Sequence, residues 1–273
     1  MGALRFSRRN LGIPYALFLA LFVILPLVLI VIYAFTDTDG NITFANFLDF
    51  FSRSANLHVL ATSFGLAILT TLICLLIAYP LSYILARSKM KASGVYLLLF
   101  ILPMWINFVL RTAAMKELLF MLDSIGLYSV ADNYFLSTVI GMVYDYLPFT
   151  ILPIYTVLIK LDKNVLEASE DLGANSFQTF FRTTLPLSFP GIVSAITMVL
   201  LPTTTSYVIS DTLGNSKVTI IGKLIENQFN IGTADSWHTG SAISLILLVF
   251  IFATMLLTGK FQQNTNNRGG GLW

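Results

Sequence analysis

Charged residues are scarce in this chain of 273 residues. Asp, Glu, Lys and Arg together make up 11% of the sequence, whereas soluble domains carry about 25%. Hydrophobic residues make up 56%, and the mean hydropathy is +0.80. The sequence therefore predicts an integral membrane protein.

Cysteine, histidine and the common catalytic motifs are also scarce. Cys74 is the only cysteine, which excludes an internal disulfide, and His58 and His238 stand alone at positions more typical of structural residues than of ligands. There is no G-x-x-x-x-G-K-[ST] motif, because Gly222-Lys223 lacks the first glycine and the following Ser or Thr. Neither H-E-x-x-H nor G-x-S-x-G occurs. We therefore expect no ATP site, metal site or catalytic residue in this chain, and no binding to nucleic acid.

Six apolar segments are long enough to cross a bilayer. The first follows a basic tail and exceeds the apolar core of a signal peptide, so we interpret it as a retained span. The predicted spans cover residues 14–35, 62–86, 94–111, 137–159, 191–210 and 237–258. The sequence predicts an all-α membrane protein, with an N-terminal tail at 1–13, a six-span domain at 14–258 and a C-terminal tail at 259–273.

The distribution of basic residues predicts the orientation of these spans. Three Lys or Arg lie in the N-terminal tail, three between the second and third spans, three in the 160–190 loop and two in the C-terminal tail. The loops on the other side hold five: Arg53, Arg111, Lys116, Lys217 and Lys223. Cytoplasmic loops carry the excess of Lys and Arg, so we expect both termini and the 160–190 loop in the cytoplasm.

The 160–190 loop begins with a predicted short helix. Asn164 is a candidate N-cap, with Glu167 three residues later in an approximate capping box. Gly173 suits the left-handed conformation that ends a helix. A small apolar face is predicted at helical spacing by Val165, Ala168, Ser169 and Leu172.

A second short helix is predicted from Ser176, with Pro186 and Pro190 stopping it before the next apolar run. Glu170 and Asp171 lie near the negative end of the first helix, where a carboxylate is unfavourable. A basic partner surface would relieve this charge, and so would Arg182 within the loop. Both interpretations are open from the residues alone.

The spacing within this loop resembles the EAA loop of ABC-importer permeases. That pattern is E-A-A, three residues, G, nine residues, I, one residue and L-P, and it is matched here by Glu167, Ala168, Gly173, Leu185 and Pro186. Ser169 replaces the third-position Ala, and Thr183 replaces the Ile. The resemblance implies that an ATPase docks on the loop, with coupling residues Val165, Glu167, Ala168, Ser169, Glu170, Asp171, Leu172 and Gly173.

Three further segments resemble the permeases of spermidine/putrescine ABC importers, and the similarity extends from the first span to the sixth. They are LPMWINFVLR at 102–111, VYDYLPFTILPIYTVLIKLDKNVLEASEDLGA at 143–174 and LPTTTSYVISDTLGN at 201–215. The resemblance implies a type I ABC-importer fold in a bacterial inner membrane. It also implies a second permease subunit, two ATPase subunits that bind the ATP and Mg, and an extracellular substrate-binding protein.

Carboxylates and aromatic rings in the spans are candidates for contact with a polyamine. Organic ammonium groups pair with carboxylates and lie over aromatic faces, and an ionisable residue within a span is a functional candidate by default. The predicted substrate-path residues are Trp105, Tyr144, Asp145, Tyr146, Tyr207 and Asp211. We also expect Pro202 and the threonines after it to weaken the fifth span and expose carbonyls to the path.

Structural alternatives exist for each path residue, and other functions for the chain. Asp145 could pair with Arg111 or with a base of a partner subunit, the tyrosines could form an aromatic belt, and Trp105 could pack. An ABC permease for a metal complex or an anion is the main alternative function. A stand-alone secondary transporter would need no docking loop, and a membrane enzyme would need catalytic motifs.

Overall fold

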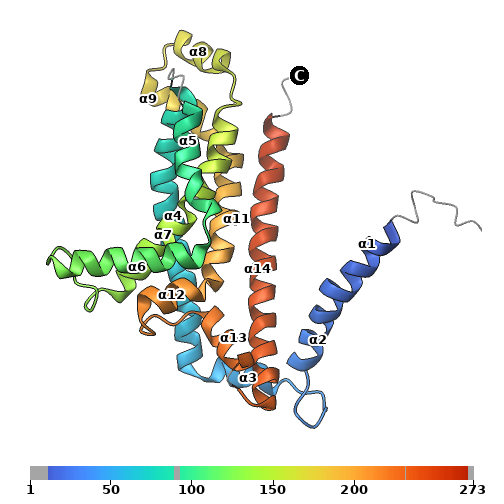
Figure 1. Cartoon of the computed structure of the whole chain (residues 1–273). Helices are drawn as coiled ribbons and strands as arrows, with labels where there is room; N and C mark the ends of the chain where they lie inside the picture. Colours follow the sequence, from blue (N-terminus) through green and yellow to red (C-terminus); the bar gives the residue numbers. More distant parts are fainter. Residues whose placement is uncertain (1–11, 89–92, 231, 270–273) are drawn as a thin grey trace, which may run out of the picture. The chain divides into compact units, whose positions relative to one another are not determined.

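The computed structural model describes residues 12–88, 93–230 and 232–269, which are helical almost throughout (Figure 1). Within these ranges the only β-type pairing is an isolated bridge between Thr36 and Ile42. The residues form two compact units. One contains the chain up to Leu57 and Leu224–Phe250, and the other contains His58–Lys223 and the chain from Ile251 onward. The prediction of an all-α chain is confirmed.

The first unit contains the N-terminal apolar helix, which is built from α1 (Gly12–Leu19), the π-helical turn η1 (Ala20–Ile24) and α2 (Leu25–Ala34). A turn then leads to α3 (Ala45–Ser52). In that turn the backbone N–H of Asn41 donates to Asp37 Oδ1 at 2.8 Å, which lowers the pKa of the Asp37 carboxyl.

His238 belongs to the same unit and holds the end of α2. Its Nδ1 lies 3.0 Å from the carbonyl oxygen of Tyr33 and 3.3 Å from Thr36 Oγ1. Its ring meets the Tyr33 ring edge-on at 5.2 Å between centroids. These contacts agree with the structural role predicted for this histidine.

The second unit contains most of the remaining helices. They are α4 (Ser54–Arg87), α5 (Ser93–Ile101), η2 (Leu102–Trp105), α6 (Phe108–Ser124), α7 (Tyr134–Leu158), α8 (Lys163–Asp171), α9 (Ser176–Thr179), η3 (Phe180–Thr184), α10 (Leu185–Leu187), α11 (Phe189–Thr205) and α12 (Tyr207–Gly214). α4 contributes its first residues to the first unit, and both units share α13 (Ile221–Asn230) and α14 (Ala234–Gly269).

α7 lies at the centre of the second unit and packs against α4, α11 and α12. One buried cluster includes Leu66, Met142, Ile209 and Leu213, and a second includes Ala78, Ile151, Ile154 and Ala195. Hydrogen bonds also join the helices. One of 2.8 Å between Tyr79 Oη and Ser188 Oγ connects α4 to the residue just before α11. These contacts hold α4, α7, α11 and α12 together.

Four helices in the described residues are long and apolar enough to cross a membrane, or up to six if each of two bent pairs is one span. The four are Gly12–Ala34, Ser54–Arg87, Tyr134–Leu158 and Asp235–Lys260. The pairs are Ser93–Trp105 with Phe108–Ser124, bent by 99°, and Ser176–Leu187 with Phe189–Thr205, bent by 60°. The predicted six is thus the upper limit of this range. α14 continues to Gly269, eleven residues past the predicted end of the last span at 258.

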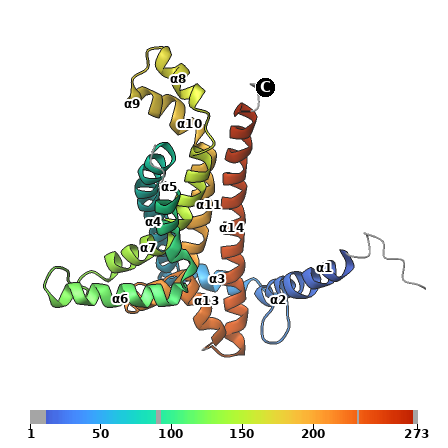
Figure 2. The same cartoon turned by 45° about the horizontal axis from the view of Figure 1, so that its top comes forward.

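The predicted span at 94–111 is not one straight helix. Pro103 lies in the 3-10 turn η2, and Ile106 is extended. Asn107 then caps a new helix, because its side chain accepts a hydrogen bond from the N–H of Val109 at 2.9 Å. Figures 1 and 2 show α6 projecting to one side of the bundle formed by α4 and α7.

The predicted span at 191–210 is also interrupted. α11 ends at Thr205, three residues after Pro202, and α12 begins at Tyr207. The hydroxyls of Thr203, Thr204 and Thr205 donate to backbone carbonyls of α11 at 2.7, 2.8 and 3.2 Å. α11 thus runs through Pro202 and is interrupted only at Ser206, and the threonines satisfy nearby carbonyls with their own hydroxyls.

Candidate functional site

The 160–190 loop folds as two short helices at one end of the second unit (Figure 1). α8 begins at Lys163, and its N-cap is Asp162, whose Oδ1 accepts from the N–H of Asn164 at 2.9 Å. The predicted cap at Asn164 is therefore wrong, because the helix begins one residue before it and Asp162 supplies the acceptor. The predicted helix itself is present.

Gly173 turns the chain between the two helices. Its φ is +86°, a conformation that L-residues with side chains resist. Its N–H donates to the carbonyl of Glu170 at 2.9 Å. The second helix, α9, is capped by Asn175 in a full capping box with Gln178. The helix-turn-helix prediction is thus confirmed, although the chain continues through Pro186 as a helix and bends only at Ser188.

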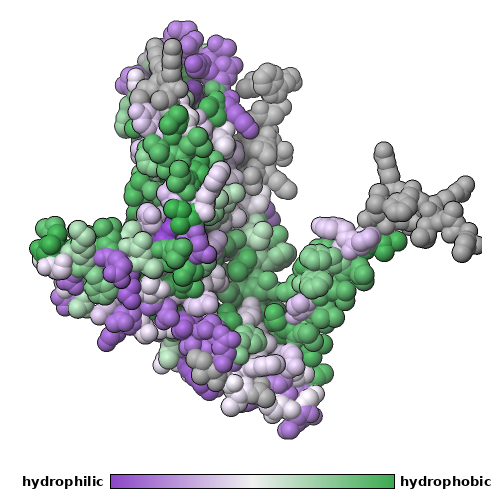
Figure 3. Space-filling view, in the orientation of Figure 1, coloured by the Kyte–Doolittle hydropathy of each residue, from purple (hydrophilic) through white to green (hydrophobic). Residues whose placement is uncertain are grey.

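The tip of the loop exposes apolar and acidic side chains together. Leu172 is 90% exposed, Phe177 71% and Val165 46%. Glu167, Glu170 and Asp171 are also exposed, and within the described ranges no ion pair joins them to Arg182. Figure 3 shows this end of the molecule as mainly hydrophilic, above a mainly hydrophobic bundle. Relief of the acidic charge by Arg182 therefore has no support in the structure.

Ser169 faces the inside of the loop rather than the exposed apolar surface. Its Oγ lies 3.3 Å from Thr179 Oγ1 and 3.3 Å from Thr183 Oγ1. The predicted common face of Val165, Ala168, Ser169 and Leu172 is thus divided, because Ser169 lies at its edge and bonds to the following helix. Ser169 and Thr183 are the two residues that depart from the EAA pattern, and the structure places them in contact.

Asp145 lies in α7 and is paired within the chain. Its Oδ2 accepts a hydrogen bond from Thr112 Oγ1 at 2.9 Å, and its Oδ1 lies 3.3 Å from Arg111 Nε. The side chains of Asp145 and Arg111 are 3% and 5% exposed. The approach of Nε to Oδ1 is not aligned as a hydrogen bond, and Arg111 Nη1 is also buried with no hydrogen-bond partner in the described residues.

This arrangement matches the structural alternative for Asp145. Its carboxylate is held by two residues of α6, so the pair joins the bent helix to the central one. Arg111, placed by the sequence among the loop charges, is in fact a buried residue.

Asp211 and Tyr207 lie together on α12, where a lysine meets both. Lys223 Nζ is 3.3 Å from Asp211 Oδ2 and 5.7 Å from the centre of the Tyr207 ring. The side chains of Lys223 and Asp211 are 26% and 39% exposed. In the sequence, this third residue is marked only by an isolated positive charge twelve residues from Asp211.

The other predicted path residues are dispersed. Trp105 is 84% exposed and lies in η2, and Tyr144 is 38% exposed. Tyr146 is more buried, and its hydroxyl donates to Ser206 Oγ at 3.1 Å. Asp145 is held by α6 and Asp211 by Lys223, so the structure does not join the two carboxylates in one site. In the described part of the chain no group of three His, Cys, Asp or Glu forms a metal site.

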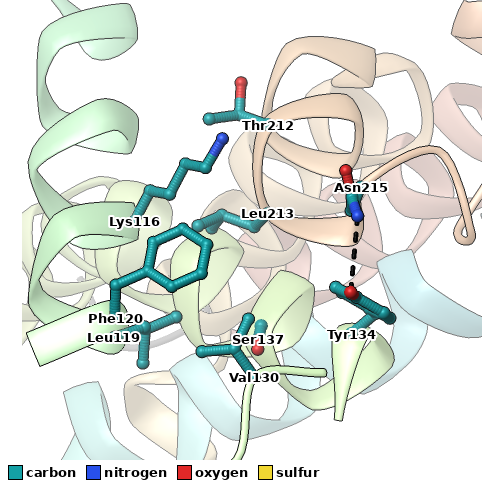
Figure 4. Close-up of a pocket in the computed structure, with 9 residues that line it drawn as sticks. All are labelled: Lys116, Leu119, Phe120, Val130, Tyr134, Ser137, Thr212, Leu213 and Asn215. Carbon is teal, nitrogen blue, oxygen red and sulfur yellow. Dashed lines mark hydrogen bonds between the residues drawn. The ribbon is translucent and has the colours of Figure 1, made fainter. Parts of the chain in front are cut away.

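A small cavity of about 70 Å³ lies between α6, α7 and α12 (Figure 4). Lys116, Phe120, Tyr134, Thr212 and Asn215 line it, together with Leu119, Val130, Ser137 and Leu213. Asn215 Nδ2 donates to Tyr134 Oη at 3.3 Å, and Lys116 Nζ lies 5.8 Å from the Phe120 ring centre. None of the predicted path residues lines this cavity.

Comparison with known proteins places the chain among transport components. Residues 78–267 match the family described as "Binding-protein-dependent transport system inner membrane component". The spermidine/putrescine transport system permease protein PotB of Haemophilus influenzae is 35% identical over 94% of this chain and 97% of that protein. PotB of Escherichia coli is also 35% identical, over 89% of this chain and 96% of its own length.

Solved structures show the same fold. A bacterial alginate ABC transporter, crystallised with an alginate-bound periplasmic protein, contains a chain with a TM-score of 0.75 at 15% identity, covering 94% of this chain and 93% of that one. The MetNI methionine ABC transporter contains one with a TM-score of 0.58 at 15% identity, covering 77% and 95%. At such low identity these matches establish the fold alone.

Proposed function

This chain belongs to the family of inner membrane components of binding-protein-dependent transport systems, and we propose from this premise that it is a permease subunit of a polyamine ABC importer. The observation that carries the proposal is the 35% identity to a spermidine/putrescine permease over nearly the full length of both chains. The protein is a multi-pass protein of the bacterial inner membrane. It contributes half of the substrate path and a surface that couples this path to the ATPase subunits, which hydrolyse the ATP.

The partners follow from the family and from the loop. We infer a second permease subunit that completes the path, two ATPase subunits that bind ATP and Mg, and an extracellular substrate-binding protein. The exposed Leu172 and Phe177 beside exposed carboxylates suit a shallow ATPase groove with a basic rim. α8 would carry the movement of the ATPases into α11 through the continuous helical run from Ser176 to Leu187.

The finer topology is also part of the proposal. With one crossing of the membrane in each bent pair, the chain crosses six times, and both termini and the 160–190 loop lie in the cytoplasm. The basic asymmetry supports this orientation, and burial of Arg111 strengthens it by removing one charge from the opposite side.

The path residues divide into three groups. We assign Asp211 and Tyr207 to contact with the cation, since both are accessible and adjacent. Tyr144 and Trp105 remain candidates through their exposure, and Tyr146 through its position near Ser206. Asp145 has a positioning role in this proposal, because its carboxylate is buried as well as paired with Arg111 and Thr112, whereas the Asp211 pair is partly exposed.

The test is uptake of labelled spermidine and putrescine by proteoliposomes that contain the assembled transporter and its binding protein. ATP-dependent uptake, competed by unlabelled polyamine and not by sulfate or an iron chelate, is the expected result. Uptake of an anion or a metal complex with no effect of polyamines would contradict the proposed substrate.

A further inference from the structure

Lys223 places its ammonium group beside a carboxylate and an aromatic ring. Its Nζ is 3.3 Å from the Asp211 carboxylate and 5.7 Å from the centre of the Tyr207 ring. A carboxylate and an aromatic face are the two groups that an organic cation seeks in a protein. The described structure thus contains a cation site that is filled by the chain's own side chain.

The chemistry of the occupant resembles that of the substrate. A lysine side chain is a primary ammonium on a four-carbon stem, and putrescine and one arm of spermidine are likewise primary ammonium groups on four-carbon chains. A site that holds one of these groups by ion pairing and ring contact is suited to hold the other.

The backbone under Lys223 is fixed, so exchange would involve the side chain alone. The N–H of Ile221 donates to Ser63 Oγ at 2.7 Å, and a Cβ at Gly222 would collide with the backbone carbonyl of Thr205. The pair is also partly exposed, unlike Arg111–Asp145, whose side chains are 5% and 3% exposed. Partly exposed ion pairs are weak, which makes this one replaceable.

We propose that Lys223 is a tethered substitute for the substrate: its aminobutyl group occupies the ammonium site of Asp211 and Tyr207 until a polyamine exchanges with it. This inference rests on the proposed polyamine function. The exchange keeps the Asp211 carboxylate neutralised at every stage, so the path is never left with an unpaired negative charge. Lys223 thereby sets how strongly the permease itself retains the substrate.

The experiment measures binding of labelled spermidine to the purified, assembled transporter by equilibrium dialysis, without binding protein or ATP. Lys223→Gln removes the competing ammonium and is expected to tighten binding about threefold, the effect of losing a weak ion pair. Lys217→Gln is the matched control, since Lys217 is an exposed basic residue six positions away. The Lys217→Gln transporter should bind spermidine with the affinity of the wild type. Asp211→Asn should weaken binding, and adding Lys223→Gln to it should give no further gain.

Lys223→Arg serves as a second variant that keeps the charge and the fold. A guanidinium binds a carboxylate with two parallel hydrogen bonds, so spermidine should bind more weakly than to the wild type. Unchanged or weaker binding in Lys223→Gln, or unchanged or tighter binding in Lys223→Arg, would show that the lysine only supports Asp211. Wild-type transporter that neither binds nor transports spermidine would instead overturn the proposed function, so the two failures are distinct.

Discussion

At the scale of single residues, the Arg111–Asp145 pair shows two buried charges whose removal from water costs free energy. Two charges have left water, yet Arg111 Nε and Nη1 and Asp145 Oδ1 have no hydrogen bond among the described residues. Such a pair adds little net stability, but the loss of one partner leaves the other uncompensated. Its value lies in fixing α6 against α7.

Asp145→Asn is therefore expected to destabilise the protein by about 3–5 kcal/mol, because the Arg111 charge stays buried without a counter-charge. The double variant Arg111→Met, Asp145→Leu removes both charges and should recover most of the loss. Thermal unfolding of the purified complex in detergent measures both. Asp211→Asn is the control, since its ion pair is partly exposed, and it should melt near the wild type. If the Asp145→Asn protein melts at the wild-type temperature and loses only polyamine uptake, Asp145 contacts the substrate and the structural role is wrong.

A second residue-scale prediction concerns Gly173. At a φ of +86° a side chain is strained by about 1–2 kcal/mol, although nothing lies within 4 Å of a Cβ there. Gly173→Ala should leave the subunit inserted but change the turn between α8 and α9. ATP hydrolysis should then be poorly stimulated by the loaded binding protein. Gly65→Ala is the matched control, because Gly65 lies within α4 with equally open space, and normal stimulation in both variants would contradict a coupling role for the turn.

At the scale of elements, the α8–α9 loop is held together by hydroxyls where the EAA pattern has apolar residues. Ser169, Thr179 and Thr183 form a chain of contacts of 3.3 Å between α8 and η3. The two substitutions thus appear at positions that touch, which explains how both are accommodated without loss of the helix-turn-helix.

Ser169→Ala alone is expected to cost about 1 kcal/mol, since Thr183 and Thr179 lose a hydrogen-bond partner in a part-buried position. The double variant Ser169→Ala, Thr183→Ile replaces the polar contact with an apolar one and should regain stability. The ratio of ATP hydrolysed to spermidine transported measures the effect on coupling. This ratio should rise in the single variant and return to the wild-type value in the double variant. Equal ratios in all three proteins would show that these hydroxyls have no part in coupling.

The elements also show which features the sequence could predict. The loop was predictable because Gly173 and the E-A-x spacing are local signals, and the apolar runs of α2, α4 and α7 are long. The corner at Asn107 was missed because the span prediction averages hydropathy over a window, whereas the break depends on the turn at Pro103 and on one side chain, Asn107, that caps the start of a new helix. Lys223 was missed for another reason. Its partner lies twelve residues away across the turn after α12, so only folding brings the two together.

At the scale of the whole molecule, the proposed topology places residue 160 in the cytoplasm and residue 127 outside. Both Lys160 and Leu127 are exposed. In a Cys74→Ala background, Leu127→Cys should react with an impermeant thiol reagent in intact cells, and Lys160→Cys should react only after permeabilisation. Labelling of position 160 in intact cells would reverse the proposed orientation.

The sharp corner between α5 and α6 has a mechanical consequence. α6 has 17 residues and is therefore about 25 Å long, and it leaves the corner at 99° to the preceding helix. If it rotated about Asn107, it would act as a lever arm, since a rotation of about 10° there would move its far end by roughly 4 Å. The Arg111–Asp145 pair lies one turn from the fulcrum, where the same rotation moves atoms least. A contact that holds α6 near the corner would therefore limit a much larger movement at Ser124.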